Sequence, residues 1–192
     1  EIKYYAITKF TPTFLEKEFS LEIHNDVIRC RELESNKVVE KSLSKKYDIP
    51  SINFIGFIDR VDVLEKNISV IDYKSSKTDF SLESLELGFI SQILTYFLAC
   101  EMLFNKKSED ILGIFYREIA KLGKTIKDYR LRGLGNSDLI LQSDFSEATS
   151  EVMFLRTTKK GTAIHGADVT KAYTSKELDT LVEKNLHKIG RA

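Results

Sequence analysis

Two aspartates and a lysine stand out because they lie in two short apolar segments that are otherwise typical of buried strands. Residues 58–64 and 68–71 are rich in Val, Ile and Leu, which favour strands. The polar residues 65–67 between them suit a hairpin turn. Antiparallel pairing about this turn places Asp59 opposite Asp72, to within one residue, and the Cβ atoms of facing residues lie about 4.5–5.5 Å apart. We therefore expect two carboxylates to share one small volume.

Strand alternation brings an amine to the same place. Asp72 and Lys74 project from one face of the strand, whereas Tyr73 points away. Close carboxylates repel each other unless a cation joins them, and Mg²⁺ takes one or two carboxylates together with waters and phosphate oxygens. Such a metal can activate water for attack on phosphorus, with Lys74 orienting the water or neutralising the transition state. Spacing alone leaves an alternative equally open, in which the aspartates are turn residues and Lys74 is a solvated strand end.

The composition fits a single domain with a proper core. The chain has 192 residues, 42% of them hydrophobic, with 29 basic and 29 acidic side chains, so attraction to nucleic acid or to a membrane requires a local patch. Cys30 and Cys100 form no Cys-x-x-Cys pair, which disfavours a thiolate metal site and fits reduced cysteines of a cytoplasmic protein. No apolar run approaches the roughly 18 residues of a membrane span. Because the first residue is Glu1, we expect a piece of a longer chain.

The segment before the hairpin is expected to contribute strands. Residues 1–10 have the pattern of a helix end, and residues 18–24 alternate as a half-buried strand. A turn signal at 25–26 precedes a return strand at 27–30. Residues 32–47 are mostly polar and are interpreted as a partly mobile excursion. The side chains expected on the buried face of the first strand are Phe19, Leu21 and Ile23.

After the hairpin, the periodicity changes to that of helices. Apolar residues recur at helical spacing over 80–104, and Gln92 and Tyr96 stand four apart, hence on one face. These two residues also fit a plain polar edge of a core helix. Residues 111–119 are strand-like, and parallel pairing to the hairpin would use the helix as a crossover. The pattern predicts an α/β fold with a mixed central sheet flanked by helices.

The C-terminal part adds one more strand and a closing helix. Residues 152–156 are strand-like, and Thr174 with Glu177 forms a capping box that predicts a helix start. The apolar residues expected along one side of this helix are Leu178, Leu181, Val182, Leu186 and Ile189.

A basic segment separates these two parts. Six basic side chains stand against the two acids Glu118 and Asp128, and Tyr116 and Tyr129 flank them. Positive charge with aromatic rings suits phosphate contact and base stacking, although a charge run is more often a solvated face. The basic residues are Arg117, Lys121, Lys124, Lys127, Arg130 and Arg132.

Several motifs in this order resemble a known signature. The chain reads Gly-Phe-Ile-Asp-Arg-Val-Asp at 56–62, then Asp-Tyr-Lys-Ser-Ser at 72–76, and Gln-x-x-x-Tyr at 92–96. This order is similar to the RecB-type branch of the PD-(D/E)XK nuclease superfamily, and especially to the C-terminal nuclease domain of AddB/RexB subunits. The likeness is dense from Pro12 to Arg117 and includes Pro-x-x-x-Glu-x-x-Phe at 12–19.

The resemblance implies a restriction-endonuclease-like fold and a role for each motif residue. Asp59 and Asp72 would be the metal-binding acids, the main-chain carbonyl of Tyr73 a further ligand, and Lys74 the catalytic lysine. Gln92 and Tyr96 would support the site and approach the DNA strand. The implied cofactor is Mg²⁺, for which Mn²⁺ can substitute.

Two features depart from the family's pattern. The family carries an upstream helix with a metal-binding histidine, and nothing before Asp59 fits. His24 is interpreted as a surface histidine, and His165 and His187 come too late in the chain. Relatives with an iron–sulfur cluster hold it with cysteines at places that Cys30 and Cys100 do not match, so no cluster is expected in this chain. We therefore expect residues 1–192 to be one nuclease domain lacking the upstream helix.

The resemblance implies a metal-dependent DNA exonuclease module of a bacterial, cytoplasmic helicase–nuclease that repairs double-strand breaks. DNA and a second protein of the helicase–nuclease complex are the implied partners, and no membrane is involved. Nucleic-acid contacts are expected from Gln92, Tyr96, Arg117, Lys121 and Lys124. Two alternatives stay open: a non-catalytic DNA-guiding domain of the same kind of complex, and a free-standing RecB-like nuclease of phage or CRISPR-associated type.

Overall fold

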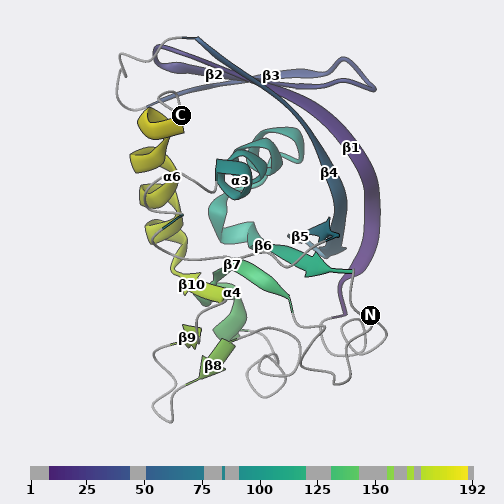
Figure 1. Ribbon diagram of the computed structural model, residues 1–192, viewed down its shortest axis with the longest axis vertical. Helices are drawn as coiled ribbons and strands as arrows, with labels where there is room; N and C mark the ends of the chain where they lie inside the picture. Colours follow the sequence, from purple (N-terminus) through teal and green to yellow (C-terminus); the bar gives the residue numbers. More distant parts are fainter. Residues whose placement is uncertain are drawn as a thin grey trace.

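The structure is a computed structural model that describes residues 9–43, 51–75, 84, 91–119, 131–142, 155–157, 164–166 and 170–189 (Figure 1). The strands are β1 (Thr11–His24), β2 (Val27–Glu32), β3 (Val38–Ser42), β4 (Ile52–Leu64), β5 (Asn67–Lys74), β6 (Ile111–Glu118), β7 (Arg132–Asn136), β8 (Leu155–Thr157), β9 (Ile164–Gly166) and β10 (Thr170–Tyr173). The helices are α3 (Ser91–Leu103), the short 3₁₀ helix η1 (Ser108–Asp110), α4 (Ser137–Gln142) and α6 (Ser175–Ile189).

Eight of the described strands form one mixed sheet in the order β10-β7-β6-β5-β4-β1-β2-β3. Strand β5 runs parallel to β6, and β7 runs parallel to β10, whereas the other neighbours are antiparallel. Strands β8 and β9 pair separately. The prediction of a mixed sheet flanked by helices is confirmed.

Strands β1 and β4 are long and curve around α3 (Figure 1). The alternation predicted for residues 18–24 is confirmed, since Phe19, Leu21 and Ile23 are each at most 1% exposed. The turn at 25–26 and the return strand β2 are also confirmed. Residues 1–8, where a helix end was expected, lie outside the described residues.

The prediction of a polar excursion at 32–47 is wrong for residues 38–42, which form β3 and pair with β2 at the edge of the sheet. The charged side chains of Glu40 and Lys41 suit an exposed edge strand, because charges there discourage pairing with other chains. The Arg29 guanidinium bonds to Glu40 across the two strands at 2.8 Å. Residues 44–47 lie outside the described part of the chain.

The β4–β5 hairpin has the predicted register. Its turn is at Glu65 and Lys66, where Glu65 takes a left-handed φ of 53°. The last paired residues are Arg60 and Ile71, so the next facing positions are Asp59 and Asp72. The chain then passes through α3 and returns as β6 in the predicted parallel crossover. The expected helix 80–104 is described as helical at Ser84 and from Ser91.

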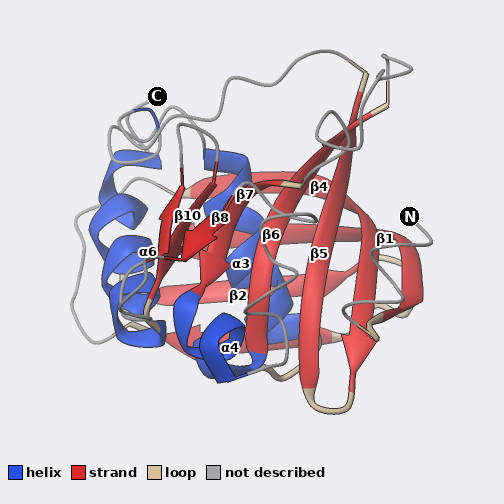
Figure 2. Cartoon of the chain, turned by 90° about the horizontal axis from the view of Figure 1, so that it is seen from below, coloured by secondary structure: helices blue, strands red, loops and turns tan. Residues whose placement is uncertain are grey.

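Helices α3 and α4 lie on opposite sides of the sheet (Figure 2), and apolar side chains pack on both of its faces. The larger cluster joins the concave face to α3 and α6 and contains the free cysteines Cys30 and Cys100, both buried. A smaller cluster on the other face includes Phe10, Phe115 and Ile140 of α4. No helix in the described ranges is long and apolar enough to cross a membrane.

The closing helix α6 begins as predicted. The backbone N–H of Thr174 donates to Glu177 at 2.8 Å, and the Glu177 N–H donates to the Thr174 hydroxyl at 3.2 Å, as in a capping box. Four of the five apolar residues predicted on its inner side are buried, and the side chain of Ile189 is outside the described set. The expected strand 152–156 is described only from Leu155, within β8.

Candidate functional site

A hollow of about 530 Å³ lies beside the open end of the β4–β5 hairpin, against α3. Its position follows from the strand pairing, since β4 continues beyond its last pair with β5 and leaves that edge open. The polar residues that line it are Asp59, Asp72, Tyr73, Lys74, Gln92, Thr95 and Tyr96. The structure therefore brings together the acids, the lysine and the helix residues that the sequence predicted.

Asp59 bonds to the opposite strand through its side chain. The backbone N–H of Tyr73 donates to Asp59 Oδ2 at 2.7 Å. This bond occupies one carboxylate oxygen and fixes the other relative to β5. The side chain of Asp59 is half-buried and lines the hollow, where it can still meet a ligand.

Asp72 and Lys74 face the same side of β5, as predicted. The Lys74 ammonium lies 2.6 Å from Asp72 Oδ2 and donates to Gln92 Oε1 at 2.8 Å. Gln92 Nε2 donates to the Tyr96 hydroxyl at 2.8 Å, confirming that these two α3 residues share a face. The Tyr96 hydroxyl lies 3.1 Å from Asp72 Oδ1 and donates to the Phe57 carbonyl at 2.6 Å. A continuous network thus connects β4, β5 and α3.

The environment of Asp72 disfavours its negative charge. The residue is 3% exposed, and this burial raises the pKa of its carboxyl, with Asp59 adding to the rise while Lys74 opposes it. Burial likewise raises the pKa of Tyr96, with a further contribution from Asp72, so the phenol stays protonated and can donate. Lys74 Nζ also lies 4.9 Å from the centre of the Tyr116 ring, within the range of a cation–π interaction.

The donor set fits a hard divalent cation. Asp59, Asp72 and the Tyr73 carbonyl could offer oxygen atoms, the donors that Mg²⁺ and Mn²⁺ prefer over nitrogen or sulfur. A cation here would also relieve the repulsion between the two carboxylates. No group of three or more His, Cys, Asp and Glu side chains suited to a metal occurs among the described residues.

Arg60 and Asp62, for which the sequence predicted no role, form a buried ion pair on the face of β4 away from Lys74. Arg60 is 4% exposed and Asp62 0%. Arg60 Nε and Nη2 donate to the two Asp62 oxygens, both at 2.6 Å. The signal available in the sequence was two opposite charges spaced two apart within an apolar strand, because such residues share one face.

Of the basic segment, only the two ends, residues 117–119 and 131–132, fall among the described residues. Tyr116 is 3% exposed beneath Lys74, so the expectation of base stacking on its ring is wrong. Arg132 pairs with Glu118 at 3.0 Å. Arg117 is half-buried in β6 beside Tyr73. The predicted DNA contacts Lys121 and Lys124 lie outside the described residues.

His24 is exposed at the end of β1 and interacts with Asn25 at 2.9 Å, which confirms it as a surface residue.

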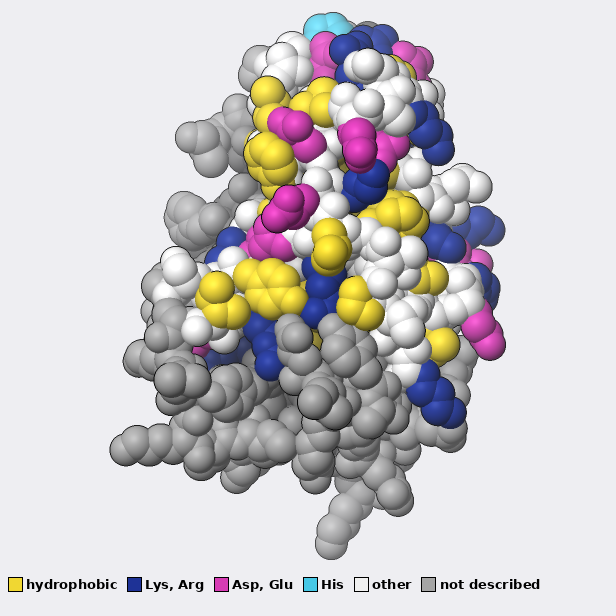
Figure 3. Space-filling model, turned by 90° about the vertical axis from the view of Figure 1, so that its right-hand side faces the viewer, with side chains coloured by type: hydrophobic (Ala, Val, Ile, Leu, Met, Phe, Trp, Pro, Cys, Tyr) yellow, Lys and Arg dark blue, Asp and Glu magenta, His cyan; other side chains and the backbone are white. Residues whose placement is uncertain are grey.

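On the side of the molecule where β1 lies, basic, acidic and hydrophobic side chains are interspersed (Figure 3). The hydrophobic residues Leu15, Ile55 and Phe57 are exposed by more than half.

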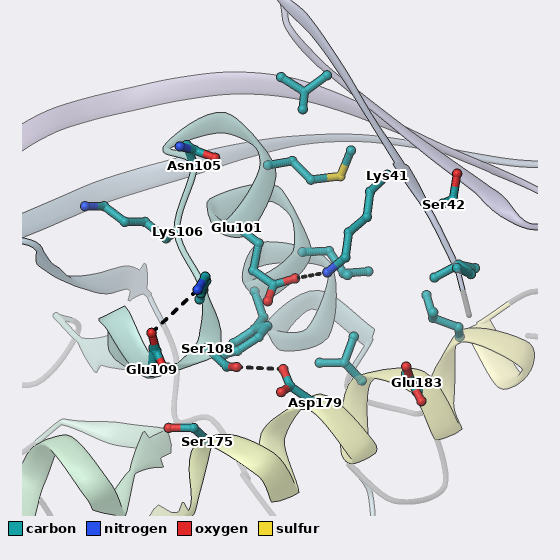
Figure 4. A pocket seen from close by; sticks show the side chains of 18 of the residues that line it. Lys41, Ser42, Glu101, Asn105, Lys106, Ser108, Glu109, Ser175, Asp179 and Glu183 are labelled. Atoms are coloured by element: carbon teal, nitrogen blue, oxygen red, sulfur yellow. Dashed lines mark hydrogen bonds and ion pairs between the residues drawn. The ribbon is translucent and has the colours of Figure 1, made fainter. Parts of the chain in front are cut away.

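A larger hollow, of about 710 Å³, lies between β3, α3 and α6 and contains none of the predicted site residues. Two pairs of polar groups in it contact each other (Figure 4): Lys41 contacts Glu101 at 2.7 Å, and Ser108 donates to Asp179 at 2.6 Å. Burial raises the pKa of Glu101. The smaller hollow is the better candidate site, because it is lined by Asp59, Asp72 and Lys74 of the motifs together with Gln92 and Tyr96 of α3.

Comparison with protein families agrees with this geometry. The model of the PD-(D/E)XK nuclease superfamily matches residues 5–190. The chain belongs to this superfamily. The match covers nearly all of the chain, including the hairpin, α3 and α6. The motifs and the elements that carry them therefore all lie within the matched region.

Several similar curated proteins share one name, which describes them as a subunit of an ATP-dependent helicase/deoxyribonuclease. The protein of Streptococcus suis is 33% identical over 106 residues, 52% of this chain and 10% of that protein. The protein of Thermoanaerobacter sp. is 42% identical over 91 residues, 42% of this chain and 8% of that protein. The protein of Streptococcus pyogenes is 26% identical over 179 residues, 88% of this chain and 16% of that protein. The chain thus spans only 8–16% of the length of these relatives.

Proposed function

We propose that this chain is the nuclease module of a bacterial helicase–nuclease and that it hydrolyses DNA phosphodiester bonds as a metal-dependent exonuclease. The observation that carries the proposal is the network in which Asp72, Lys74 and Gln92 meet Asp59 in one hollow, on a chain of a nuclease superfamily. The names of the relatives support DNA as the substrate and a helicase–nuclease as the setting.

The residues proposed to hold the cation are Asp59, Asp72 and the Tyr73 carbonyl. Mg²⁺ is the proposed ion, with Mn²⁺ as a substitute; when bound, it would lower the pKa of a water and stabilise charge on the phosphoryl group. The Tyr73 N–H keeps Asp59 turned toward β5 through its 2.7 Å bond. Tyr96 and Gln92 lie on the Oδ1 side of Asp72, which leaves Oδ2 in contact with Lys74.

Lys74 is the proposed catalytic lysine. Its ammonium donates to Gln92 Oε1 at 2.8 Å, which holds it toward the hollow, and lies 2.6 Å from Asp72 Oδ2. From this place the ammonium can orient a water through hydrogen bonds and offset the negative charge that develops on the phosphoryl oxygens. A side chain that is 28% exposed can reach a substrate without leaving its partners.

Gln92, Arg117, Lys121 and Lys124 are the proposed nucleic-acid contacts. Tyr96, also predicted as one, is 4% exposed with its hydroxyl on Phe57 and Asp72, so its proposed role is to support the site. Contacts to phosphate position a strand but do not read its sequence, so cleavage is expected to be largely independent of sequence. A partner protein within the complex and a cytoplasmic location are part of the same proposal, supported by the names of the relatives.

The test is cleavage of labelled linear DNA by the purified full-length protein with Mg²⁺, compared with its Asp72→Ala variant. We expect the variant to lose at least about 100-fold in rate, because one of two metal-binding carboxylates is gone. Its circular dichroism spectrum should match that of the unmodified protein. Mg²⁺-dependent cleavage by Asp72→Ala at an undiminished rate would refute the assignment.

A second candidate function is a non-catalytic domain that guides DNA within the same kind of complex. The observation that favours it is that the described residues contain no third carboxylate, histidine or cysteine grouped with Asp59 and Asp72. A calorimetric Mn²⁺ titration separates the two functions. Absence of binding, together with absence of cleavage, would favour the guiding domain over the nuclease.

A further inference from the structure

The buried ion pair between Arg60 and Asp62 is unusual because stability does not require it. Removing two charges from water costs several kcal/mol per ion, and apolar pairs of similar volume are often equally or more stabilising. Both side chains are nearly inaccessible, at 4% and 0% exposed. The two bonds of 2.6 Å between them form a bidentate contact, which fixes the plane of the guanidinium.

The fixed guanidinium holds a residue of the candidate site. Arg60 Nη1 donates to the Tyr73 hydroxyl at 2.7 Å. The ring of Tyr73 packs against the small cluster that includes Ile71 and Phe115, on the face of the sheet away from Lys74. Its backbone N–H donates to Asp59, and its carbonyl is a proposed metal ligand. Tyr73 is therefore held by its ring on one face of the sheet, while its backbone N–H bonds to Asp59 and its carbonyl is placed to bind the cation.

The strand pairing explains why this contact matters for geometry. The pairing of β4 with β5 ends at Arg60 and Ile71, so Asp59 and Asp72 lie just beyond the last paired positions. The contacts that join the two strands at Tyr73 include the Asp59 carboxylate bond and the Arg60 bond. Because Asp59 and Arg60 are consecutive, holding Arg60 to Tyr73 also holds Asp59 in place.

We propose that Arg60, oriented by Asp62, is a positioning residue that sets the separation of Asp59 and Asp72 by anchoring the Tyr73 hydroxyl. This role rests on the proposed function, since it concerns the spacing of the metal-binding acids. Arg60 does not touch the substrate; it acts through Tyr73 from the opposite face of the sheet. Loss of the Arg60–Tyr73 bond lets Asp59 and Asp72 move relative to each other. This weakens cation binding more than it slows cleavage once the cation is bound.

The first test removes only the anchored oxygen. In Tyr73→Phe the ring stays and the bond to Arg60 is lost. We expect the Mn²⁺ dissociation constant to rise about tenfold, as is common when a residue that orients a metal ligand is lost. Calorimetry measures binding without turnover. In DNA cleavage, the Mn²⁺ concentration for half-maximal rate should rise likewise, while the rate at saturating Mn²⁺ changes less than threefold.

Tyr173→Phe is the matched control. It removes a phenol oxygen from another largely buried tyrosine, 8% exposed, on β10. Strands β6 and β7 separate β10 from β5 in the sheet. Mn²⁺ affinity and the half-maximal Mn²⁺ concentration should stay within twofold of those of the unmodified protein, whatever happens to thermal stability.

A second variant separates positioning from folding. Arg60→Met alone would leave Asp62 buried and uncompensated, so both residues are replaced in Arg60→Met/Asp62→Leu, a change that often preserves stability. We expect this double variant to unfold within a few degrees of the unmodified protein and to bind Mn²⁺ about tenfold more weakly.

Mn²⁺ affinity is measured for Tyr73→Phe and for the double variant below their unfolding temperatures. The positioning role would be overturned if both variants bind Mn²⁺ within twofold of the unmodified protein. In that case the unmodified protein still binds Mn²⁺ and cleaves DNA, and the proposed function stands. If the unmodified protein itself neither binds Mn²⁺ nor cleaves DNA, the proposed function fails and the positioning role fails with it.

Discussion

At the scale of single residues, Asp72 combines the conditions that a catalytic carboxylate needs and a stable fold avoids. It is almost fully buried, close to a second acid, and compensated by a single lysine. Burial is the largest cause of its raised pKa, which means that the folded state prefers the protonated form. Sites that hold charge in this manner commonly reduce stability in favour of function.

We predict that Asp72→Asn is more stable than the unmodified protein at neutral pH without metal. A raised pKa in the folded state means that folding takes up protons, so the destabilisation by Asp72 is absent well below the ordinary aspartate pKa of about 4 and grows as pH rises through the raised value. Asparagine has no such dependence.

Thermal unfolding of the two proteins between pH 4 and 8, with EDTA present, measures the difference. The advantage of the variant should increase with pH and then level off. A difference that is constant with pH, or that favours the unmodified protein at pH 7, would contradict the burial cost assigned to Asp72.

At the scale of elements, the site depends on how β5, β6 and β7 lie side by side. Strand β6 pairs with β5 up to Lys74 and Glu118 and places Tyr116 beneath the Lys74 ammonium. Strand β7 pairs with β6 at Tyr116 and Arg132. The Arg132–Glu118 contact ties the ends of these strands together. Strands β6 and β7 thus help to position Lys74, although neither carries a proposed metal ligand.

Gly133 permits the close approach of β7 to β6. Its φ is 151°, and a Cβ atom there would lie 2.2 Å from the Ile114 carbonyl oxygen. We predict that Gly133→Ala lowers the free energy of unfolding by about 2 kcal/mol or more, from backbone strain and overpacking. Denaturant titration measures the loss.

Gly135→Ala in the same strand is the control for that variant. The nearest atom to a Cβ there is the end of the flexible Ile140 side chain, at 3.0 Å, which can shift. We expect its loss to be about 1 kcal/mol or less. Equal losses for both glycines would show that the backbone clash at Gly133 is not the cause.

At the scale of the whole molecule, the sheet brings together residues from β4, β5 and α3 around one hollow. Their geometry exists only in the folded chain, so a cation that binds them must stabilise the fold. The added free energy grows with the ratio of free metal to its dissociation constant and reaches about 2.7 kcal/mol at a hundredfold excess.

We therefore predict that Mn²⁺ raises the unfolding temperature of the protein in a concentration-dependent manner and that EDTA reverses the rise. Asp72→Ala should show little or no rise, because it lacks one of the two carboxylates. Differential scanning calorimetry of both proteins over a Mn²⁺ series provides the measurement. The same rise in both would indicate that the cation binds elsewhere.

Much of the site follows from local patterns in the sequence. Alternation around a polar turn sets Asp59 across from Asp72, and a spacing of two residues turns Asp72 and Lys74 to one face. A spacing of four residues does the same for Gln92 and Tyr96 on α3. The superfamily is likewise evident from these motifs, because their order along the chain resembles the family's signature and the superfamily model matches the same residues.

Only the tertiary structure decided which partners those side chains meet. It placed the Gln92 amide on Lys74, the Tyr116 ring beneath the same ammonium, and the Arg60–Asp62 pair behind Tyr73. It also recruited residues 38–42, which lie within a mostly polar stretch, into the sheet. Local spacing fixes the face on which a side chain lies, but burial and pairing depend on strands and helices brought together from distant parts of the sequence.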